Sequence, residues 1–239
     1  MNSVYSVIKK RADAGKPQLA VLVDPDKFNP DIIPLAEQCR VSFFLVGGSL
    51  ITNGDFEKTI SLLKKRSSLP VIIFPGDEKQ VSSKADALLF LSLISGRNPE
   101  YLIGMQVRSA ALIKRKKLES ISTGYILVES GSISTTQKVS GTRPIPASDF
   151  RLAADTAIAG EMMGQQLIYL EAGSGAKKNV PLKLIRSVKK NISVPLVVGG
   201  GISSSRQAKQ ILEAGADIIV VGNALEKDMS LLYDMKKLF

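Results

Sequence analysis

The chain has 239 residues, one cysteine and no histidine, and it carries a formal net charge of +10 at pH 7. The absence of histidine excludes His-based catalytic triads, His-ligated zinc and histidine acid–base catalysis. A single cysteine excludes an internal disulfide and fits a reducing cytoplasm. No apolar run approaches the roughly 20 residues that span a bilayer. Any catalysis therefore depends on carboxylates, hydroxyls, lysines, backbone dipoles or a metal bound by oxygen.

Eight short apolar runs recur along the chain, and most are continuously hydrophobic, as strands buried on both faces should be. They lie at residues 19–23, 43–46, 71–74, 87–91, 125–128, 167–170, 194–198 and 218–221. Amphipathic helical patterns separate most of them: 30–40, a helix capped by Asn53 or Asp55 that ends at 66, 181–191, and 203–214 with Ser203 as cap. Eight such units predict a (β/α)8 TIM barrel, with residues 1–239 forming a single domain. A doubly wound open sheet is the alternative.

Two of the connections between apolar runs differ from this alternation of strands and helices. Residues 75–86 are too few and too polar to hold a full covering helix, so we expect the third helix to be short or missing. This segment either packs as a short helix or loop, or leaves a cleft for a long apolar ligand. Residues 129–146 are small and polar, which fits either a lid ordered by an anionic substrate or a disordered surface loop.

The last two apolar runs end in glycine, at Gly199-Gly200-Gly201 and at Gly222-Asn223, and a helical pattern follows each. Glycine lets the backbone turn sharply and lets a ligand approach closely. The N-terminus of a helix offers unpaired N–H groups that suit a phosphate. One such turn alone is more simply a tight connection. Two near the end of a chain of this length match the phosphate site of a TIM barrel.

Polar residues follow the first two runs as well. Asp24-Pro25-Asp26 places two carboxylates at the first run's end, which suits either an oxygen-bound Mg2+ or a plain turn. Ser49 follows Gly47-Gly48, and its hydroxyl can bind a metal, bond a phosphate or cap a helix. Because the carboxyl ends of parallel barrel strands meet at one rim, we expect these residues near the phosphate site.

The sixth run ends in a further polar group. Side chains alternate along a strand, so Tyr169 and Glu171 face the same side. Gly173 and Gly175 flank Ser174 and form a nest of backbone N–H groups that favours phosphate. Glu171 is either the base that accepts a proton from a substrate hydroxyl or the partner of a neighbouring basic residue.

Together these motifs resemble the geranylgeranylglyceryl phosphate synthase family, which includes the bacterial heptaprenylglyceryl phosphate synthases. The resemblance covers nearly the whole chain and rests on LVDPDK (22–27), FLVGGS (44–49), YLEAGSG (169–175), VGGGI (198–202) and VGN (221–223). It implies a Mg2+-dependent TIM-barrel prenyltransferase that joins sn-glycerol 1-phosphate to geranylgeranyl diphosphate and releases diphosphate. This would be the first ether-linking step of archaeal-type lipids. The family also lacks a normal third helix, which leaves a groove for the prenyl chain.

The resemblance implies roles for individual residues. Asp24 and Ser49 correspond to the magnesium ligands. From the residues themselves we expect Asp24 and Glu171 to be the catalytic residues. The implied glycerol-phosphate site comprises Tyr169, Leu170, Glu171, Ala172, Gly173, Ser174, Gly175, Gly200, Gly201, Gly222 and Asn223. Some members carry a lysine two residues before the first aspartate; this chain has Leu22 there, and Lys27 is the candidate substitute.

The positive charge fits anionic partners, but it does not indicate which anionic partner is bound. We expect sn-glycerol 1-phosphate and a polyprenyl diphosphate as substrates, transient contact with a membrane surface, and a cytoplasmic homo-oligomer. No basic–aromatic motif indicates a nucleic acid. Two other functions compete: a phosphosugar isomerase or aldolase-like barrel, and a non-catalytic basic anion-binding protein. Aldolase chemistry needs a Schiff-base lysine inside the barrel, and no apolar run contains one.

Overall fold

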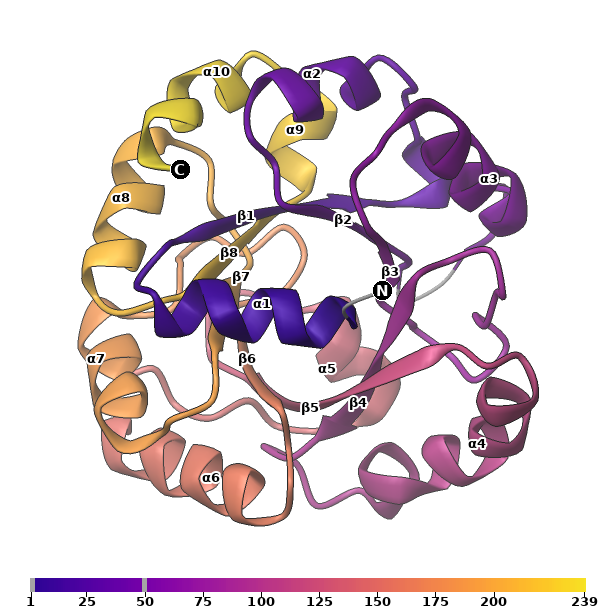
Figure 1. The fold of residues 1–239 in the computed structure, drawn as a ribbon. Helices are drawn as coiled ribbons and strands as arrows, with labels where there is room; N and C mark the ends of the chain where they lie inside the picture. The colour runs from indigo at the N-terminus through magenta and orange to yellow at the C-terminus, as the bar shows by residue number, and fades with distance from the viewer. Residues whose placement is uncertain (1–2, 49–50) are drawn as a thin grey trace.

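The computed structural model describes residues 3–48 and 51–239. Eight parallel strands close into a barrel in chain order, with β1 paired to both β2 and β8 (Figure 1). The strands are β1 (Gln18–Val23), β2 (Phe43–Val46), β3 (Val71–Ile73), β4 (Ala87–Leu93), β5 (Glu119–Leu127), β6 (Leu167–Glu171), β7 (Leu196–Gly199) and β8 (Ile218–Val221). The predicted TIM barrel is confirmed, and the open-sheet alternative is wrong.

Helices ring the barrel, as Figure 1 shows. They are α2 (Ile32–Gln38), α3 (Phe56–Arg66), α4 (Met105–Arg115), α6 (Phe150–Met162), α7 (Leu182–Asn191), α8 (Ser205–Glu213), α9 (Asn223–Lys227) and α10 (Leu231–Met235), with short turns η1 (Pro25–Lys27), η2 (Glu100–Gly104) and η3 (Lys236–Leu238). Asp55 caps α3 by accepting the Lys58 N–H. The cap predicted at Ser203 is wrong by one residue, because the Ser204 hydroxyl accepts the Gln207 N–H in the first turn of α8.

Strand β5 begins six residues before the apolar run that predicted it. Its first six residues, from Glu119 to Gly124, are mostly polar, and Ile121 is the one large apolar side chain among them. The main chain nevertheless pairs with all of β4, from Ala87 opposite Glu119 to Leu93 opposite Tyr125. Backbone hydrogen bonds to a long neighbouring strand therefore set the start of β5, and side-chain hydrophobicity does not.

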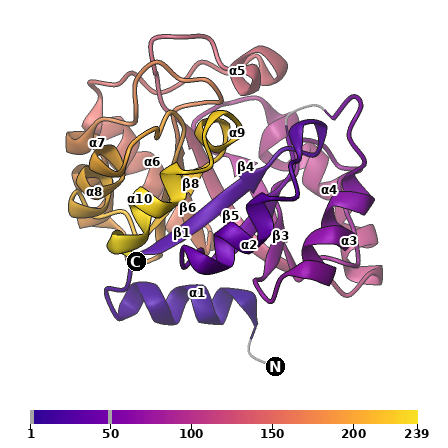
Figure 2. The same cartoon turned by 90° about the horizontal axis from the view of Figure 1, so that it is seen from above.

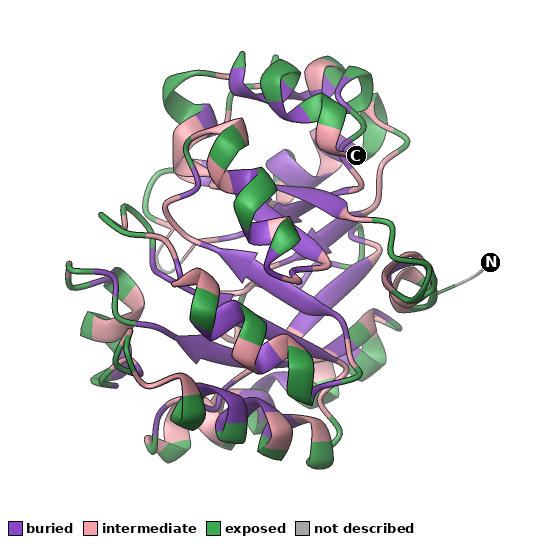
Figure 3. Ribbon diagram, turned by 90° about the vertical axis from the view of Figure 1, so that its left-hand side faces the viewer, coloured by how far each residue is buried: buried purple, intermediate pink, exposed green. Residues whose placement is uncertain are grey.

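Successive side chains along each strand alternate between two layers of the hydrophobic core. One set, including Leu45, Leu89 and Tyr169, fills the barrel interior, while the other, including Phe44, Leu88 and Leu170, packs beneath the helices. Figure 3 shows the strands largely buried, with exposure found mainly on the outer faces of the helices and in loops. This period-two division decides which side chains of a strand end reach the barrel mouth.

The first helix, α1 (Val4–Asp13), closes the amino-terminal end of the barrel (Figures 1 and 2). Ile8 is buried against the interior core, and its carbonyl accepts the side-chain amide of Gln18 at 3.1 Å. The N–H groups of Val4 and Tyr5 donate to the Glu119 carboxylate at 2.7 and 2.8 Å. A site open to solvent is therefore left to the opposite, carboxyl end of the strands.

The connection from β3 to β4 contains no helix over residues 74–86, all of which the structure describes. The expected loss of the third helix is confirmed. Val81 is buried and covers part of the uncovered strand surface. No helix of the described residues is both long and apolar enough to cross a bilayer.

Candidate functional site

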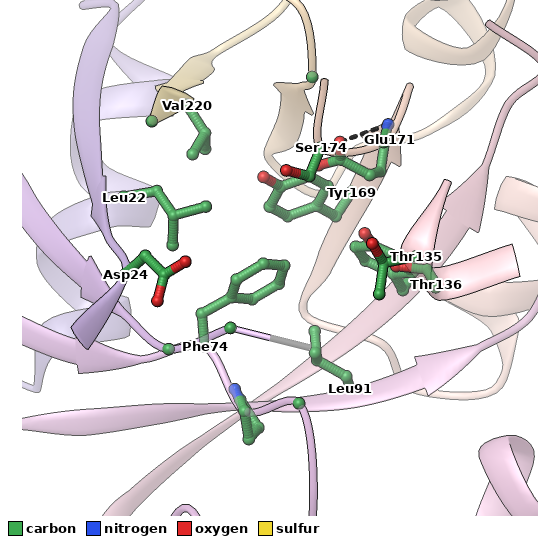
Figure 4. A pocket seen from close by; sticks show the side chains of 18 of the residues that line it. Leu22, Asp24, Phe74, Leu91, Thr135, Thr136, Tyr169, Glu171, Ser174 and Val220 are labelled. Carbon is green, nitrogen blue, oxygen red and sulfur yellow. Dashed lines mark hydrogen bonds between the residues drawn. The ribbon is translucent and has the colours of Figure 1, made fainter. Parts of the chain in front are cut away.

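A cavity of about 620 Å3 lies at the carboxyl ends of the strands. Figure 4 shows Asp24 facing Tyr169 and Glu171 across it. The predicted residues that line it are Asp24, Tyr169, Glu171, Gly173, Ser174, Gly175, Gly200, Gly201, Gly222 and Asn223. The structure thus brings the ends of β1, β6, β7 and β8 to one wall, as parallel strand order requires.

Two predicted site residues among those described do not line this wall. The side chains of Leu170 and Ala172 are buried in the outer core beneath the helices, because they alternate with Tyr169 and Glu171. Their side chains therefore cannot contact a ligand in the cavity, and the prediction that included them is wrong in that respect. Ser49 lies outside the described residues, so its predicted role as a metal ligand stays a prediction.

The two carboxylates of the Asp24-Pro25-Asp26 turn have separate tasks. The Asp26 carboxylate accepts the N–H groups of Thr52 at 2.9 Å and Asn53 at 3.0 Å, and that of Gly54. Hydrogen bonds from Thr52 and Gly54 are the main reason that the pKa of Asp26 falls to about 2. Asp26 ties the loop after β2 to η1 and does not line the cavity, so the pair expected to hold a metal is split.

Of the two carboxylates in this turn, that of Asp24 is the one that lines the cavity. Its Oδ1 accepts the Asp26 N–H at 3.0 Å, which fixes the side chain. A Cβ at Gly48 would lie 3.5 Å from Oδ1, so glycine leaves space beside the carboxylate. Among the described residues no group of three or more His, Cys, Asp or Glu side chains could hold a metal. One carboxylate completed by phosphate oxygens and water fits Mg2+ shared with a substrate, and does not fit a metal cage made by protein alone.

Glu171 is the buried carboxylate of the site, with 7% of its surface exposed. Its Oε1 accepts the Gly173 N–H at 2.6 Å, and no basic side chain of the described residues lies within ion-pair distance. Burial raises the pKa of Glu171 to about 7, and the Gly173 N–H and the adjacent Tyr169 hydroxyl limit the rise. The ion-pair alternative is thus not what the structure has. A carboxylate with this pKa can exchange a proton near neutral pH.

Three aromatic rings form the floor beneath Glu171. Tyr169 stacks on Phe74 with ring centroids 5.5 Å apart, and Tyr125 contacts both rings at 5.3 and 6.0 Å. Tyr125 lies opposite Tyr169 in the β5–β6 register. Sequence reasoning did not assign Phe74 or Tyr125 to the site. Both could have been found from the sequence, because each is an aromatic residue toward the carboxyl end of a strand whose position in the alternation points its side chain inward.

The glycine turns after β6, β7 and β8 are tied into one polar surface. The Ser174 hydroxyl donates to the Asn223 side-chain oxygen at 3.2 Å, and the Asn179 amide donates to the Gly200 carbonyl at 3.1 Å. Gly173 and Gly200 have φ values of +102° and +89°, which glycine adopts without strain. Gly47, which follows β2, lies close to the main chain just after β3, because a Cβ there would meet the Phe74 carbonyl at 1.9 Å.

The other half of the cavity is apolar and follows the gap left by the third helix. Its wall includes Phe74, Val81, Leu89, Phe90, Leu91 and Met105. This confirms a cleft beside residues 75–86. The segment 129–146 contains α5 (Thr135–Ser140), and Thr135 and Thr136 complete the wall near the aromatic floor (Figure 4). The disordered alternative does not describe this segment, and its role as a lid stays a prediction.

Comparison with known proteins agrees with this geometry. Geranylgeranylglyceryl phosphate synthase from Flavobacterium johnsoniae is 48% identical over 232 residues, which cover 95% of this chain and 96% of that protein. The synthase of the same name from Pyrococcus abyssi is 41% identical, with 100% and 96% covered. The crystal structure of (S)-3-O-geranylgeranylglyceryl phosphate synthase from Thermoplasma acidophilum, in complex with substrate sn-glycerol-1-phosphate, matches with a TM-score of 0.92 at 33% identity and covers 100% of this chain and 98% of that one. Residues 10–237 match the PcrB family, and the chain belongs to that family.

Proposed function

We propose that this protein is a prenyltransferase that joins sn-glycerol 1-phosphate to geranylgeranyl diphosphate and releases diphosphate. One observation carries the proposal: a single cavity combines three polar glycine turns, a buried carboxylate and an apolar groove. A phosphorylated polyol needs a polar surface and a long hydrocarbon chain needs an apolar one, and the reaction requires the two surfaces side by side. The names of the relatives, and the substrate bound by the Thermoplasma acidophilum enzyme, support the same assignment.

The polar half of the cavity suits glycerol phosphate. The turns at Gly173–Gly175, Gly200-Gly201 and Gly222-Asn223 line the cavity, and their glycines have no Cβ that would block a phosphate from the main chain. The Ser174–Asn223 hydrogen bond fixes the first turn against the last. A phosphate held there would leave the glycerol hydroxyls to reach toward Glu171 and the aromatic floor.

In the reaction, the allylic C–O bond to diphosphate breaks and its electron pair leaves with the diphosphate. A hydroxyl oxygen of glycerol phosphate forms the new ether bond to the same carbon. Its proton passes to Glu171, whose pKa of about 7 allows it to be an unprotonated base at neutral pH. The remaining contribution of the protein is to hold the two substrates in line.

Asp24 is the described residue that would hold Mg2+, with Ser49 as the second predicted ligand. A divalent cation bound there would neutralise charge on the diphosphate. Transient contact with an anionic membrane surface is part of this proposal, and the net charge of +10 supports it. The homo-oligomer and the cytoplasmic location stay predictions.

The competing functions explain less of the site. An aldolase-like barrel would use a Schiff-base lysine, and none of the eight strands contains a lysine. A non-catalytic anion-binding protein would have no use for a buried carboxylate that takes up a proton near pH 7.

The test is an assay with sn-glycerol 1-phosphate, Mg2+ and a series of prenyl diphosphates, with the lipid products identified by mass. We expect a prenylglyceryl phosphate and one diphosphate for each turnover. Absence of both products with every prenyl donor would reject the function.

The metal is tested separately. Asp24→Asn should raise the Mg2+ concentration needed for half-maximal rate, because one of few anionic ligands is removed. Asp31→Asn, at an exposed position whose side chain makes no helix cap, is the control. Turnover that is insensitive to EDTA would reject the metal but leave the prenyltransferase in place.

A further inference from the structure

Three lysines line the cavity among the residues that the structure describes: Lys27, Lys177 and Lys227. Only Lys27 has carboxylates on two sides. Its Nζ lies 3.0 Å from Glu226 Oε2 and 3.9 Å from Asp24 Oδ2. The ammonium group is therefore held between the end of β1 and the helix that follows β8.

The backbone around Lys27 fixes where its side chain starts. Lys27 is the last residue of η1, where Pro25 is buried and the Asp24 side chain accepts the Asp26 N–H. The Asp26 carboxylate in turn accepts N–H groups from residues 52–54. The turn is thus anchored at both ends. Glu226 reaches Lys27 from α9, which begins directly after the last glycine turn.

Leu22 explains why the cation comes from this turn and not from the strand. Leu22 is the inward residue two positions before Asp24, and its Cβ would lie 3.3 Å from a Cβ at Gly222. An apolar side chain therefore occupies the inner wall between β1 and β8. Lys27 is the basic residue that approaches Asp24 from the rim above it.

We infer that Lys27 is the cation that receives the departing diphosphate and that Glu226 positions it. The inference rests on the proposed function and names the part of the site that contacts the leaving group. When the allylic C–O bond breaks, negative charge grows on the diphosphate oxygen that keeps the electron pair. An ammonium group beside Asp24 offsets that charge and donates a charge-assisted hydrogen bond without giving up its proton.

The partial exposure of Lys27 and Glu226 suits a change of partner, in which the Lys27 ammonium group leaves Glu226 for the diphosphate. About half of the Lys27 side chain is exposed (51%), against 25% for Glu226. Since the ion pair is partly solvated, little energy is lost when Nζ turns from the carboxylate to a phosphoryl oxygen.

The test uses Lys27→Met, Lys27→Arg and Glu226→Gln in the full chain, with Lys178→Met as the control. Lys178 is exposed, lies outside the cavity wall and loses the same charge. Binding of inorganic pyrophosphate is measured by calorimetry without added metal. The steady-state kcat and KM are measured for each substrate, and thermal unfolding verifies the fold.

We expect Lys27→Met to weaken pyrophosphate binding and to lower kcat, each by about tenfold or more, because a charge-assisted bond is lost. The KM for sn-glycerol 1-phosphate should stay near the wild-type value. Lys27→Arg should restore most of the loss, and Glu226→Gln should cause a smaller loss of the same kind.

Unchanged pyrophosphate affinity in Lys27→Met would overturn the inference. So would a loss confined to sn-glycerol 1-phosphate, or an equal loss in Lys178→Met. The binding experiment does not need turnover. Weakened pyrophosphate binding in a protein that forms no prenyl product would therefore reject the proposed function while retaining the role of Lys27 as an anion-binding residue.

Discussion

Two glutamates at opposite ends of the barrel show how the same side chain serves structure or chemistry. Glu119, at the start of β5, accepts two backbone N–H groups from the first turn of α1. Glu171, at the end of β6, is buried and accepts one N–H, from Gly173. At the closed end the carboxylate satisfies a helix terminus. At the open end the Glu171 carboxylate is buried in the cavity wall and keeps unused acceptor capacity.

The difference follows from what covers each end. Helix α1 lies across the amino-terminal opening and supplies N–H donors and Ile8 to fill it. At the carboxyl end the strands lead into turns of glycine and small residues that leave a cavity open. Burial without enough donors raises a carboxylate's pKa, and this is the condition that a base needs.

The largest expected effect is on catalysis at the open end. Glu171→Gln should reduce kcat by about 100-fold to 10,000-fold, because the amide cannot accept the hydroxyl proton. Affinity for sn-glycerol 1-phosphate should change little, since the proposed phosphate site lies in the glycine turns and not at the Glu171 carboxylate. Single-turnover rates and calorimetry measure the two quantities. A variant with the wild-type rate would remove Glu171 as the base.

The next effect is on stability as a function of pH. The folded pKa of Glu171, about 7, lies above the ordinary value of 4.5, so the folded state keeps a proton that the unfolded state has lost. The free energy of unfolding should therefore fall as pH rises from about 4.5 to 7, by about 3 kcal/mol at most. In Glu171→Gln this decrease in the free energy of unfolding should be absent. Denaturant unfolding of both proteins at pH 5 and pH 8 measures it. Equal pH dependence in both proteins would contradict the raised pKa.

A third test concerns the glycine turns. Gly200→Ala should destabilise the protein by about 2 kcal/mol and weaken sn-glycerol 1-phosphate binding, because alanine is strained at positive φ. Its Cβ would also lie 2.6 Å from Glu171 Oε1. Gly131→Ala is the control: its φ is +75°, but no heavy atom lies within 4 Å of the added Cβ. Equal effects in the two variants would show that strain alone, and not crowding of the site, is responsible.

The smallest effect is expected at the closed end. Glu119→Gln should lower the free energy of unfolding by about 1 kcal/mol, because it removes a negative charge from the N-terminus of α1. Activity should be unchanged, because Glu119 is at the end of the barrel away from the cavity. Thermal unfolding and the standard assay measure both. A loss of activity without a loss of stability would contradict the separation of the two ends.

Much of this arrangement was predictable from local patterns. Continuous apolar runs and amphipathic spacers predicted the closed parallel barrel, and the short polar segment at 75–86 predicted the missing helix. The glycine-ended strands predicted which turns meet, because parallel strand order places all carboxyl ends on one rim. Alternation along β6 correctly placed Tyr169 and Glu171 on the same side.

Other features depended on contacts between distant segments. Asp24 and Asp26 look equivalent in the sequence, yet the N–H groups of residues 52–54 occupy Asp26 and leave Asp24 free for the cavity. The aromatic floor needs Phe74, Tyr125 and Tyr169 from three strands, and the Lys27–Glu226 pair joins residues 199 positions apart.

The sequence by itself determined the barrel and the rim where its site lies, because periodicity, glycine and helix-terminal chemistry act over a few residues. Only the tertiary structure decided which carboxylate became buried and basic, which became a loop anchor and which sealed the closed end. Burial and hydrogen-bond partners are set by segments that meet only after the barrel has closed.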